Sequence, residues 1–372
     1  MTRQRRILVT GAGGFVGKNL VTHLNEDSSI EVLSFSRGDS LELLSDMVIK
    51  SDTIVHLAGE NRPKHDSDYS LVNVELTRNL CQFIRNSERN IPLIFISSTQ
   101  AKLDNPYGQS KLHAEQLIEN FLNNESNSAV IFRLPGVFGK WCRPNYNSVV
   151  STFCFNIAHD LPIKINDPSL TLQLVYIDDV INEIIRSIKA IQPGLQRLEI
   201  NQIYEITLGQ LAEKILAFHN CRSSLTMDRV GIGLTRALYL TYLSYLPTEK
   251  FIYSLPQHTD DRGNFVEILK TRDSGQFSFF TIKPGITRGS HYHHSKTEKF
   301  IVVKGLACIR FRHLITGETG DITISSEKPQ VVDSIPGWVH DITNIGENEA
   351  IVMLWANEIF DRNHPDCIPA IV

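Results

Sequence analysis

Apolar residues follow two different patterns along the 372-residue chain, and the change between them falls near residue 250. In the first part, short β-branched runs alternate with segments whose apolar residues recur every three or four positions, which predicts strands alternating with helices. The expected strands are residues 7–10, 32–35, 53–57, 93–97 and 129–134. The expected helices are residues 15–24, 72–85, 111–122, 179–191 and 209–218. This alternation predicts a doubly wound parallel sheet covered by helices.

Helical periodicity is absent after residue 251, where short strand-like runs are separated by turns. The expected strands of this part are residues 277–282, 299–303, 307–312, 321–324 and 350–355. Such a pattern predicts a compact all-β sandwich or barrel. Residues 231–254 mix helix formers with Tyr and Leu and predict a packed connector. We therefore expect two domains, residues 1–246 and 247–372, as the chain length also suggests.

The composition argues against several classes of protein. Hydrophobic residues make up 42% and charged residues 21%, and the net charge of -4 provides no basic field for nucleic acid or an anionic membrane. No apolar stretch is long enough to cross a bilayer, and the basic start lacks the apolar core of a signal peptide. The six cysteines are scattered without a CxxC pair, which is typical of free thiols in a reducing compartment. We expect a soluble cytoplasmic protein without nucleic-acid or membrane partners.

A glycine-rich turn follows the first expected strand and opens the first expected helix. Glycines let the backbone turn tightly and approach a pyrophosphate, which then lies at the N-terminus of the helix. A glycine pattern alone could be a simple turn, but its position indicates the dinucleotide site of a Rossmann-type α/β fold. The residues expected to contact the cofactor here are Gly11, Gly13, Gly14, Phe15, Val16 and Gly17, with Leu57 and Ala58 at the end of the third strand.

The end of the second expected strand bears on the choice of cofactor. An acidic residue there would bind the ribose of NAD, whereas this chain has Ser36 and Arg37. An arginine beside a serine suits the 2′-phosphate of NADP, so we expect NADPH. Asp39 lies close enough to keep NAD open as an alternative.

Tyr107 precedes Lys111 by four residues, which places both on one face of a helix. A nearby ammonium group stabilises a phenolate, so we expect Lys111 to lower the pKa of Tyr107 into a range useful for acid–base catalysis. A hydroxyl group at the end of the preceding strand, from Ser98 or Thr99, could hydrogen-bond to the substrate oxygen. A surface Tyr/Lys pair would be the simpler interpretation if the glycine turn were absent.

Together these features resemble the extended short-chain dehydrogenase/reductase family over residues 5–245, with support from residues 52–59, 73–80, 133–139 and 175–179. The resemblance implies that Tyr107 and Lys111 are catalytic, that Ser98 or Thr99 supplies the hydroxyl, and that Lys111 also contacts the cofactor. It further implies a nucleotide-activated sugar as the substrate. The 4,6-dehydratases of that family carry an Asp-Glu pair where this chain has Gln100 and Ala101. We therefore expect redox chemistry and not dehydration.

The second domain contains a histidine cluster with the spacing of a metal site. His291 and His293 stand at alternate positions of an expected strand, Glu298 follows on or near the adjoining strand, and His340 lies further along. Three neutral imidazoles and a carboxylate suit zinc, iron, nickel or manganese, and we expect zinc. An exposed loop or a satisfied core histidine would explain any single member, but not the set. His294 competes for a ligand position.

The spacings of residues 285–305 and 336–344 match the two sequence signatures of cupins. This resemblance covers residues 251–372 and implies an all-β jelly-roll barrel with His291, His293, Glu298 and His340 as ligands. Residues 261–267 also resemble the opening segment of cupin-type keto-sugar 3,5-epimerases, although Asp-Arg-Gly is an ordinary turn.

A reductase followed by a metal cupin resembles the bifunctional capsular polysaccharide synthesis enzymes of the UDP-N-acetyl-L-fucosamine pathway. Residues 105–111 and 139–147 contribute to this resemblance. It implies that the cupin epimerises C3 of UDP-2-acetamido-2,6-dideoxy-4-hexulose and that the reductase then reduces the C4 ketone with NADPH. The product would be UDP-2-acetamido-2,6-dideoxy-L-talose. The expected partner molecule is thus a UDP-linked 4-keto-6-deoxy amino sugar, and we expect a homodimer.

Several assignments stay open in this interpretation. The metal would polarise the C4 carbonyl, but the base could be Lys283, Tyr292 or His294. The segment with Arg143, Asn145 and Asn147 could contact the substrate or form a surface loop. The cupin could also be only structural or sensing beside a single-activity reductase. A regulator that binds NADP without turnover is a further alternative, but it would need neither Tyr107 nor Lys111.

Overall fold

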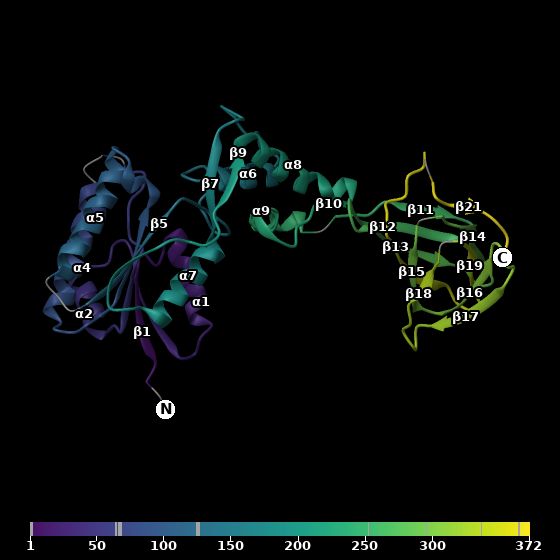
Figure 1. The fold of residues 1–372 in the computed structure, drawn as a ribbon, viewed down its shortest axis with the longest axis horizontal. Helices are drawn as coiled ribbons and strands as arrows, with labels where there is room; N and C mark the ends of the chain where they lie inside the picture. Colours follow the sequence, from purple (N-terminus) through teal and green to yellow (C-terminus); the bar gives the residue numbers. More distant parts are fainter. Residues whose placement is uncertain are drawn as a thin grey trace. The chain divides into compact units, whose positions relative to one another are not determined.

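The computed structural model describes residues 3–63, 65, 69–123, 127–251, 253–294, 296–335, 337–363 and 365–372. Ser295 and Pro336, which belong to the two cupin signatures, lie outside the described residues. The chain forms two compact units (Figure 1). The first comprises Met1–Ile215 and Arg236–Leu246, and the second comprises Leu216–Thr235 and Pro247–Val372.

The first unit contains a six-stranded parallel sheet with the order β2-β1-β3-β4-β5-β8. Its strands are β1 (Arg5–Thr10), β2 (Ile30–Phe35), β3 (Thr53–His56), β4 (Leu93–Ser98), β5 (Ser128–Leu134) and β8 (Gly194–Leu198). The chain moves in one direction from β1 to β2 and in the other from β1 to β3. The order therefore reverses beside β1, and open α/β sheets bind ligands at the carboxyl ends of the strands at such a point.

Helices cover both faces of this sheet (Figure 1). One face carries α2 (Leu41–Lys50), α4 (Leu76–Asn86) and α5 (Pro106–Asn123), whose apolar residues form one buried cluster with the strands. The other face carries α1 (Phe15–Asn25) and α7 (Ile177–Ala190), which pack against each other. The predicted doubly wound α/β fold is confirmed.

The first 250 residues also form elements beside this sheet and its covering helices, and the apolar pattern predicted only some of them. A small sheet is formed by β6 (Gly136–Phe138), β7 (Thr171–Tyr176) and β9 (Tyr204–Thr207). Further helical segments among the described residues are η1 (Ser70–Glu75), η2 (Thr99–Lys102), α6 (Val149–Ala158), α8 (Leu208–Ser224), α9 (Gly233–Leu243) and η3 (Thr248–Lys250). The expected connector at residues 231–254 thus contains α9, which buries Leu238 and Tyr242. The expected helix at residues 72–85 is split, because the π-helix η1 precedes α4.

The second unit consists of two largely antiparallel sheets with a shared apolar core. The first sheet contains β10 (Thr226–Met227), β11 (Gln257–Asp260), β12 (Gly263–Thr271), β13 (Gly275–Ile282), β15 (Glu298–Lys304), β18 (Val332–Ser334) and β20 (Ala350–Ala356). The second contains β14 (Thr287–Tyr292), β16 (Leu306–His313), β17 (Thr319–Ser325), β19 (Trp338–Asn344) and β21 (Ile368–Pro369). Val302 and Val352 of one sheet pack with Ile309 and Ile342 of the other. The all-β, cupin-like class is confirmed.

The five strands expected in this unit correspond to β13, β15, β16, β17 and β20. The apolar pattern missed β12, β14 and β19 because polar residues occupy many of their positions. Within the described part of the chain, no helix has the length and apolar character needed to span a membrane.

Candidate active site and metal centre

The glycine turn lies directly after β1, beside the point where the strand order reverses. Gly11 has a φ of +70°, and a Cβ on it would lie 2.7 Å from the backbone nitrogen of Ala58. A Cβ on Gly17 would collide with the carbonyl oxygen of Gly11. Gly14 is the N-cap of α1 and has no side chain to cap it, so the first N–H groups of the helix stay available to an anion. The turn therefore fits the pyrophosphate of a dinucleotide.

The residues after β2 border the same turn. A Cβ on Gly13 would lie 3.5 Å from the Ser36 hydroxyl oxygen. The carboxylate of Asp39 accepts a hydrogen bond from the Ser36 backbone N–H at 2.7 Å, so it stabilises the local turn. The side chain of Arg37 is 84% exposed and forms an ion pair with Glu60 at 2.7 Å. Ser36 and Arg37 are thus close to the expected cofactor, although Arg37 already has a partner.

Tyr107 lies in the first turn of α5, where it contacts the end of β4. Its hydroxyl group forms a hydrogen bond with Ser98, the last residue of β4, while Thr99 begins η2. Burial raises the pKa of Tyr107, the Ser98 hydrogen bond opposes this, and the expected lowering by Lys111 is not found. A raised pKa keeps the phenol protonated at neutral pH. Tyr107 is therefore suited to donate a proton to a ketone oxygen.

Lys111 follows Tyr107 by one helical turn and is 5% exposed. Its ammonium group donates to the carbonyl oxygen of Ile96 at 3.1 Å and lies 5.0 Å from the centre of the Phe95 ring. Burial lowers the pKa of Lys111 to about 8. A Cβ on Gly59 would lie 3.1 Å from the lysine nitrogen, so this glycine, three residues beyond β3, leaves room for the lysine side chain.

A buried ion pair that we did not predict holds α5 on the sheet. Glu115 on α5 accepts two hydrogen bonds from the Nε and Nη2 atoms of Arg133, at 2.9 and 2.5 Å. It also accepts a hydrogen bond from the Ser97 hydroxyl group. Since Arg133 lies on β5 and Ser97 on β4, this interaction fixes α5 against two strand ends. Arg133 opens the 133–139 motif, which was the available signal in the sequence.

A cavity of about 310 Å³ opens beside Tyr107. It is lined by Asn61, Tyr69, Gln100, Asn105, Pro106, Tyr107 and Asn147. Sequence analysis left open whether the segment with Arg143, Asn145 and Asn147 contacts the substrate or forms a surface loop. Of these three residues, Asn147 lines the cavity. In contrast, the side-chain amide of Asn145 donates to Asn156 on α6, and Arg143 lies over the ring of Tyr146 at 4.9 Å.

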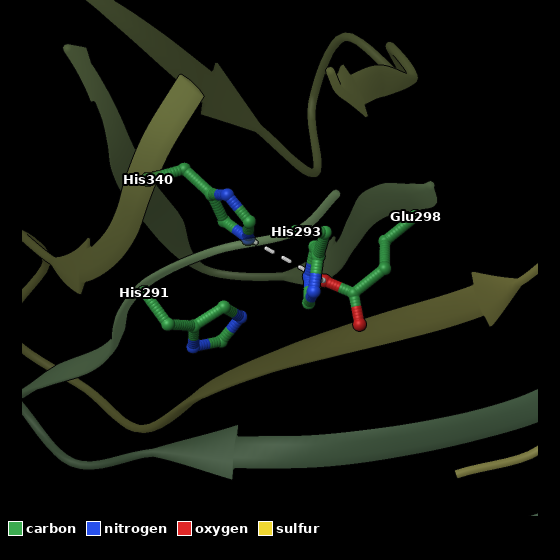
Figure 2. Close-up of side chains that lie close together, drawn as sticks. All are labelled: His291, His293, Glu298 and His340. Atoms are coloured by element: carbon green, nitrogen blue, oxygen red, sulfur yellow. Dashed lines mark ion pairs between the residues drawn. The ribbon is translucent and has the colours of Figure 1, made fainter. Parts of the chain in front are cut away.

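In the second unit, the four predicted metal ligands converge (Figure 2). The candidate ligand atoms of His291, His293, Glu298 and His340 all lie within 4.8 Å of one another. The carboxylate oxygen Oε2 of Glu298 is 3.4 Å from the Nε2 atoms of both His293 and His340. The Nε2 atoms of the three histidines are buried and have no hydrogen-bond partner among the described residues. Such a cluster of buried lone pairs fits a divalent cation.

Strand pairing explains the convergence. His291 on β14 lies directly opposite His340 on β19, so their side chains share one face of the sheet. A bulge between Gly289 and His291, with Ser290 at a φ of +62°, sets this register. His293 lies one residue beyond the end of β14, and Glu298 begins β15 in the other sheet. The expectation that both histidines lie on one strand was therefore wrong for His293, yet the ligands meet between the sheets.

Further hydrogen bonds orient these ligands. The Nδ1 atom of His293 donates to the carbonyl oxygen of Asp366, which leaves the lone pair of Nε2 directed into the cluster. The ammonium group of Lys296, which we did not predict, lies 3.1 Å from Oε1 of Glu298 and is 7% exposed. The Asp366 carboxylate accepts hydrogen bonds from the backbone N–H groups of His294 and Lys296 at 2.8 Å. His294 is exposed and is not part of the ligand cluster.

Burial and the His340 imidazole lower the pKa of His291 to about 4, so it is neutral at physiological pH, as a metal ligand must be. Burial alone raises the pKa of Glu298, but the two neighbouring imidazoles and Lys296 together hold it well below its usual value. The cluster therefore combines neutral nitrogen ligands with an ionised carboxylate.

A cavity of about 210 Å³ reaches this cluster. Its lining combines ligands with two arginines, an aspartate and an apolar wall, and comprises Arg262, Phe265, Phe280, Arg288, Gly289, His291, Glu298, Phe300, Ile309, His340, Asp341, Ile342 and Leu354. The three expected bases Lys283, Tyr292 and His294 do not line the cavity as the described residues define it. The structure thus gives no support to these three assignments.

Comparison with known proteins agrees with both halves of this description. Residues 7–206 match the NAD dependent epimerase/dehydratase family, and residues 258–368 match the polysaccharide biosynthesis C-terminal domain. The chain is 52% identical over 361 residues to the UDP-2-acetamido-2,6-beta-L-arabino-hexul-4-ose reductase of Pseudomonas aeruginosa, covering 97% of each protein.

Solved structures show the same arrangement within each unit. The capsular polysaccharide assembling protein CapF of Staphylococcus aureus is 41% identical, with a TM-score of 0.91 and coverage of 98% of this chain and 100% of that chain. The UDP-glucuronic acid 4-epimerase of Bacillus cereus, in complex with UDP-glucuronic acid and NAD, is 18% identical with a TM-score of 0.56. It covers 64% of this chain and 98% of that chain, and shows the fold alone.

The fold and the two clusters define an enzyme with a dinucleotide-binding α/β unit followed by a cupin-like barrel with a candidate metal centre. The chain belongs to the NAD dependent epimerase/dehydratase family. The predicted relationship to the reductase–cupin enzymes of capsular polysaccharide synthesis is confirmed by these relatives.

Proposed function

We propose that this enzyme carries out two successive reactions on one nucleotide sugar. The cupin-like unit epimerises C3 of UDP-2-acetamido-2,6-dideoxy-4-hexulose, and the reductase unit reduces the C4 ketone to give UDP-2-acetamido-2,6-dideoxy-L-talose. The observation that carries this proposal is the presence, in one chain, of a buried three-histidine and carboxylate cluster and a Ser98–Tyr107–Lys111 site. The 52% identical relative, a reductase named for a UDP-linked 4-ketosugar, supports the choice of substrate.

In the cupin-like unit, His291, His293, Glu298 and His340 would hold a zinc ion. When bound, such an ion supplies a Lewis acid that makes the proton next to a carbonyl easier to remove. The apolar wall of the cavity, with Phe265, Phe280 and Phe300 among its residues, limits water around the sugar. Lys296 holds one oxygen of Glu298, which leaves the other oxygen facing the imidazoles.

In the reductase unit, the glycine turn would hold the pyrophosphate of the cofactor, with Phe15 and Val16 in the first turn of α1. Ser36 and Arg37 would contact the 2′-phosphate of NADPH, and Leu57, Ala58 and Lys111 the side nearer the nicotinamide. The reduced nicotinamide supplies a hydride when bound. Tyr107, kept protonated by burial and oriented by Ser98, donates a proton to the C4 oxygen. Lys111 would contribute a buried positive charge one helical turn after Tyr107.

The test is to supply the purified protein with the UDP-linked 4-keto-6-deoxy amino sugar in deuterated water, with and without NADPH. Without NADPH, we expect deuterium at C3 of the sugar, detected by NMR. With NADPH, we expect consumption of the cofactor and a talose-configured product. Cofactor consumption without any exchange at C3 would favour the alternative of a single-activity reductase with a structural or sensing cupin.

We further propose that the enzyme works in the cytoplasm as a homodimer. Free thiols suit a reducing compartment, and all six cysteines are unpaired. Light scattering after gel filtration should give twice the chain mass of 42.1 kDa, and a mass of one chain would contradict the dimer.

A further inference from the structure

Glu60 occupies a position between the expected cofactor and the cavity beside Tyr107. It lies four residues beyond β3, and its side chain is only 12% exposed. One carboxylate oxygen, Oε2, accepts a hydrogen bond from Arg37 at 2.7 Å. The other, Oε1, accepts a hydrogen bond from the Tyr146 hydroxyl group at 3.2 Å. One carboxylate thus joins a residue of the cofactor side to a residue of the substrate side.

The backbone around Glu60 is held firmly. The side-chain oxygen of Asn73 accepts a hydrogen bond from the Glu60 N–H at 2.7 Å, and its nitrogen donates to the Glu60 carbonyl oxygen at 3.0 Å. Asn73 lies in the π-helix η1, a type of segment that is frequent at functional sites. The N–H groups of Asn61 and Arg62 donate to Oε1 at 3.1 and 3.2 Å. These contacts fix the direction of the carboxylate.

On the substrate side, Glu60 holds the segment that precedes α6. Tyr146 is followed by Asn147, which lines the cavity beside Tyr107. Arg62 donates to the side-chain oxygen of Asn147 at 3.1 Å, which ties the same two segments together a second time. The position of Asn147 in the cavity therefore depends on the contact between Glu60 and Tyr146.

On the cofactor side, Glu60 competes with the 2′-phosphate of the dinucleotide for the guanidinium group of Arg37. Arg37 is the guanidinium group after β2, and its ion pair with Glu60 occupies part of its hydrogen-bonding capacity. A 2′-phosphate has to share Arg37 with this carboxylate or displace it. A dinucleotide without that phosphate meets no such competition.

We propose that Glu60 is a positioning and specificity residue for the reductase site. It holds Tyr146 and Asn147 at the substrate cavity and, through Arg37, limits how strongly the enzyme prefers a 2′-phosphorylated dinucleotide. The cofactor half of this inference rests on the proposed function, in which the reductase uses NADPH.

Glu60→Gln removes the charge of the side chain but keeps its shape. We expect this substitution to change the affinities for NADP⁺ and for the UDP-sugar in opposite directions. In Glu60→Gln, Arg37 is freed for the phosphate, so we expect NADP⁺ to bind about threefold more tightly, as for loss of an exposed ion pair. Tyr146 loses a charged acceptor, so we expect the UDP-sugar to bind about tenfold more weakly. NAD⁺ binding should not change. A residue with only a structural role would weaken the binding of all three.

The experiment measures Kd by calorimetry for NADP⁺, NAD⁺ and the UDP-sugar, each added alone to the intact protein. Tyr146→Phe should weaken only the binding of the UDP-sugar, and Arg37→Met should weaken only the binding of NADP⁺. Glu60→Asp, which keeps the charge, should bind NADP⁺ less tightly than Glu60→Gln does. Glu31→Gln is the matched control, because Glu31 also forms a 2.7 Å pair with an arginine, Arg6, in the same unit, and it should leave all three constants unchanged.

Equal weakening of all three ligands in Glu60→Gln, or no change in any, would overturn the inference. If Arg37→Met binds NADP⁺ more weakly while Glu60→Gln leaves all three dissociation constants unchanged, the proposed role of Glu60 is contradicted. The proposal that the reductase uses NADPH is then still supported. If the unsubstituted protein binds NAD⁺ as tightly as NADP⁺, the proposed cofactor is wrong, and the cofactor half of the inference fails with it.

Discussion

The proposed reductase site and the candidate metal centre use burial for opposite purposes. In the first unit, burial raises the pKa of Tyr107, so the phenol keeps its proton. Burial also lowers the pKa of Lys111, one turn later on the same helix, so the ammonium group loses its proton more easily. In the second unit, burial keeps His291 unprotonated, so that its lone pair is available. The first arrangement suits a group that gives a proton, and the second suits a cluster that receives a cation.

The two sites also differ in how the chain assembles them. Tyr107 and Lys111 are one turn apart on α5, and Glu115 on the same helix secures it to two strands. The metal cluster instead depends on a bulge in β14, a strand partner on β19 and a carboxylate from the opposite sheet. Local substitutions should therefore separate the two activities, and the following predictions test this separation from the largest expected effect to the smallest.

Tyr107→Phe should reduce NADPH-dependent ketone reduction by about a thousandfold, because the substitution removes the general acid but keeps the ring. Exchange of the C3 proton with solvent should continue at the unsubstituted rate. Both can be measured on one sample, by absorbance of the nicotinamide and by NMR. A parallel loss of exchange would mean that one site serves both reactions.

His291→Ala should lower C3 exchange by about a hundredfold, because the Lewis acid loses a ligand. The protein should also contain less bound metal by elemental analysis, while NADP⁺ binding by calorimetry should be unaffected. His313→Ala is a suitable control, since His313 lies on β16 in the same unit outside the ligand cluster. Undiminished exchange in His291→Ala would show that the cluster does not serve the epimerisation.

Lys111→Met should stabilise the first unit at neutral pH by on the order of 2 kcal/mol, because it removes a charge whose burial is unfavourable. The pKa of Lys111 is lowered from 10.5 to about 8, so the unfolded chain binds more protons between these values. The unfolding free energy of the unsubstituted protein should therefore rise with pH between about 8 and 10.5. Above this range the unsubstituted protein should be as stable as Lys111→Met. Denaturant unfolding at several pH values measures this difference.

Lys102→Met provides the control for Lys111→Met, since Lys102 is exposed. Its unfolding free energy should follow that of the unsubstituted protein at every pH. A deficit in the unsubstituted protein that stays constant from pH 7 to 11 would contradict a role for the Lys111 ammonium group.

Lys296→Met should weaken metal binding by about tenfold, because Glu298 loses the group that holds its second oxygen. Competition with a chelator of known affinity measures the change. Lys299→Met is a matched control, because Lys299 forms an exposed pair with Asp333 and should leave the affinity unchanged. Equal metal affinity in both variants would remove Lys296 from the description of the centre.

The sequence predicted the parts of each site that depend on fixed spacing. A strand followed by a run of glycines was enough to predict the turn for a dinucleotide. The His-x-His…Glu…His spacing was enough to predict the four-residue cluster, although the strands β14 and β19 were not predicted. The strands β14 and β19 were missed because each carries a histidine ligand at an inward position and polar residues at many others, so the alternation on which strand prediction relies is weak. Helices α2 and α6 were also missed, although each follows a serine N-cap, Ser40 and Ser148, which is a helix-start signal in the sequence.

Other features depend on contacts that spacing does not encode. Glu60, for example, meets Tyr146 across 86 residues of sequence. The pKa of Tyr107 was predicted in the wrong direction because the charge of Lys111 was considered without the burial of the phenol. The base for epimerisation was sought next to the histidines in sequence, whereas the cavity wall is formed by residues from several strands.

The central claim is that epimerisation precedes reduction and takes place at the metal centre of the same chain. The most direct test is to run the complete reaction in deuterated water with ordinary NADPH and to determine the isotope at C3 of the product by mass spectrometry and NMR. We predict one deuterium at C3 in essentially every product molecule. A product that carries hydrogen at C3, formed at the full rate, would contradict the claim.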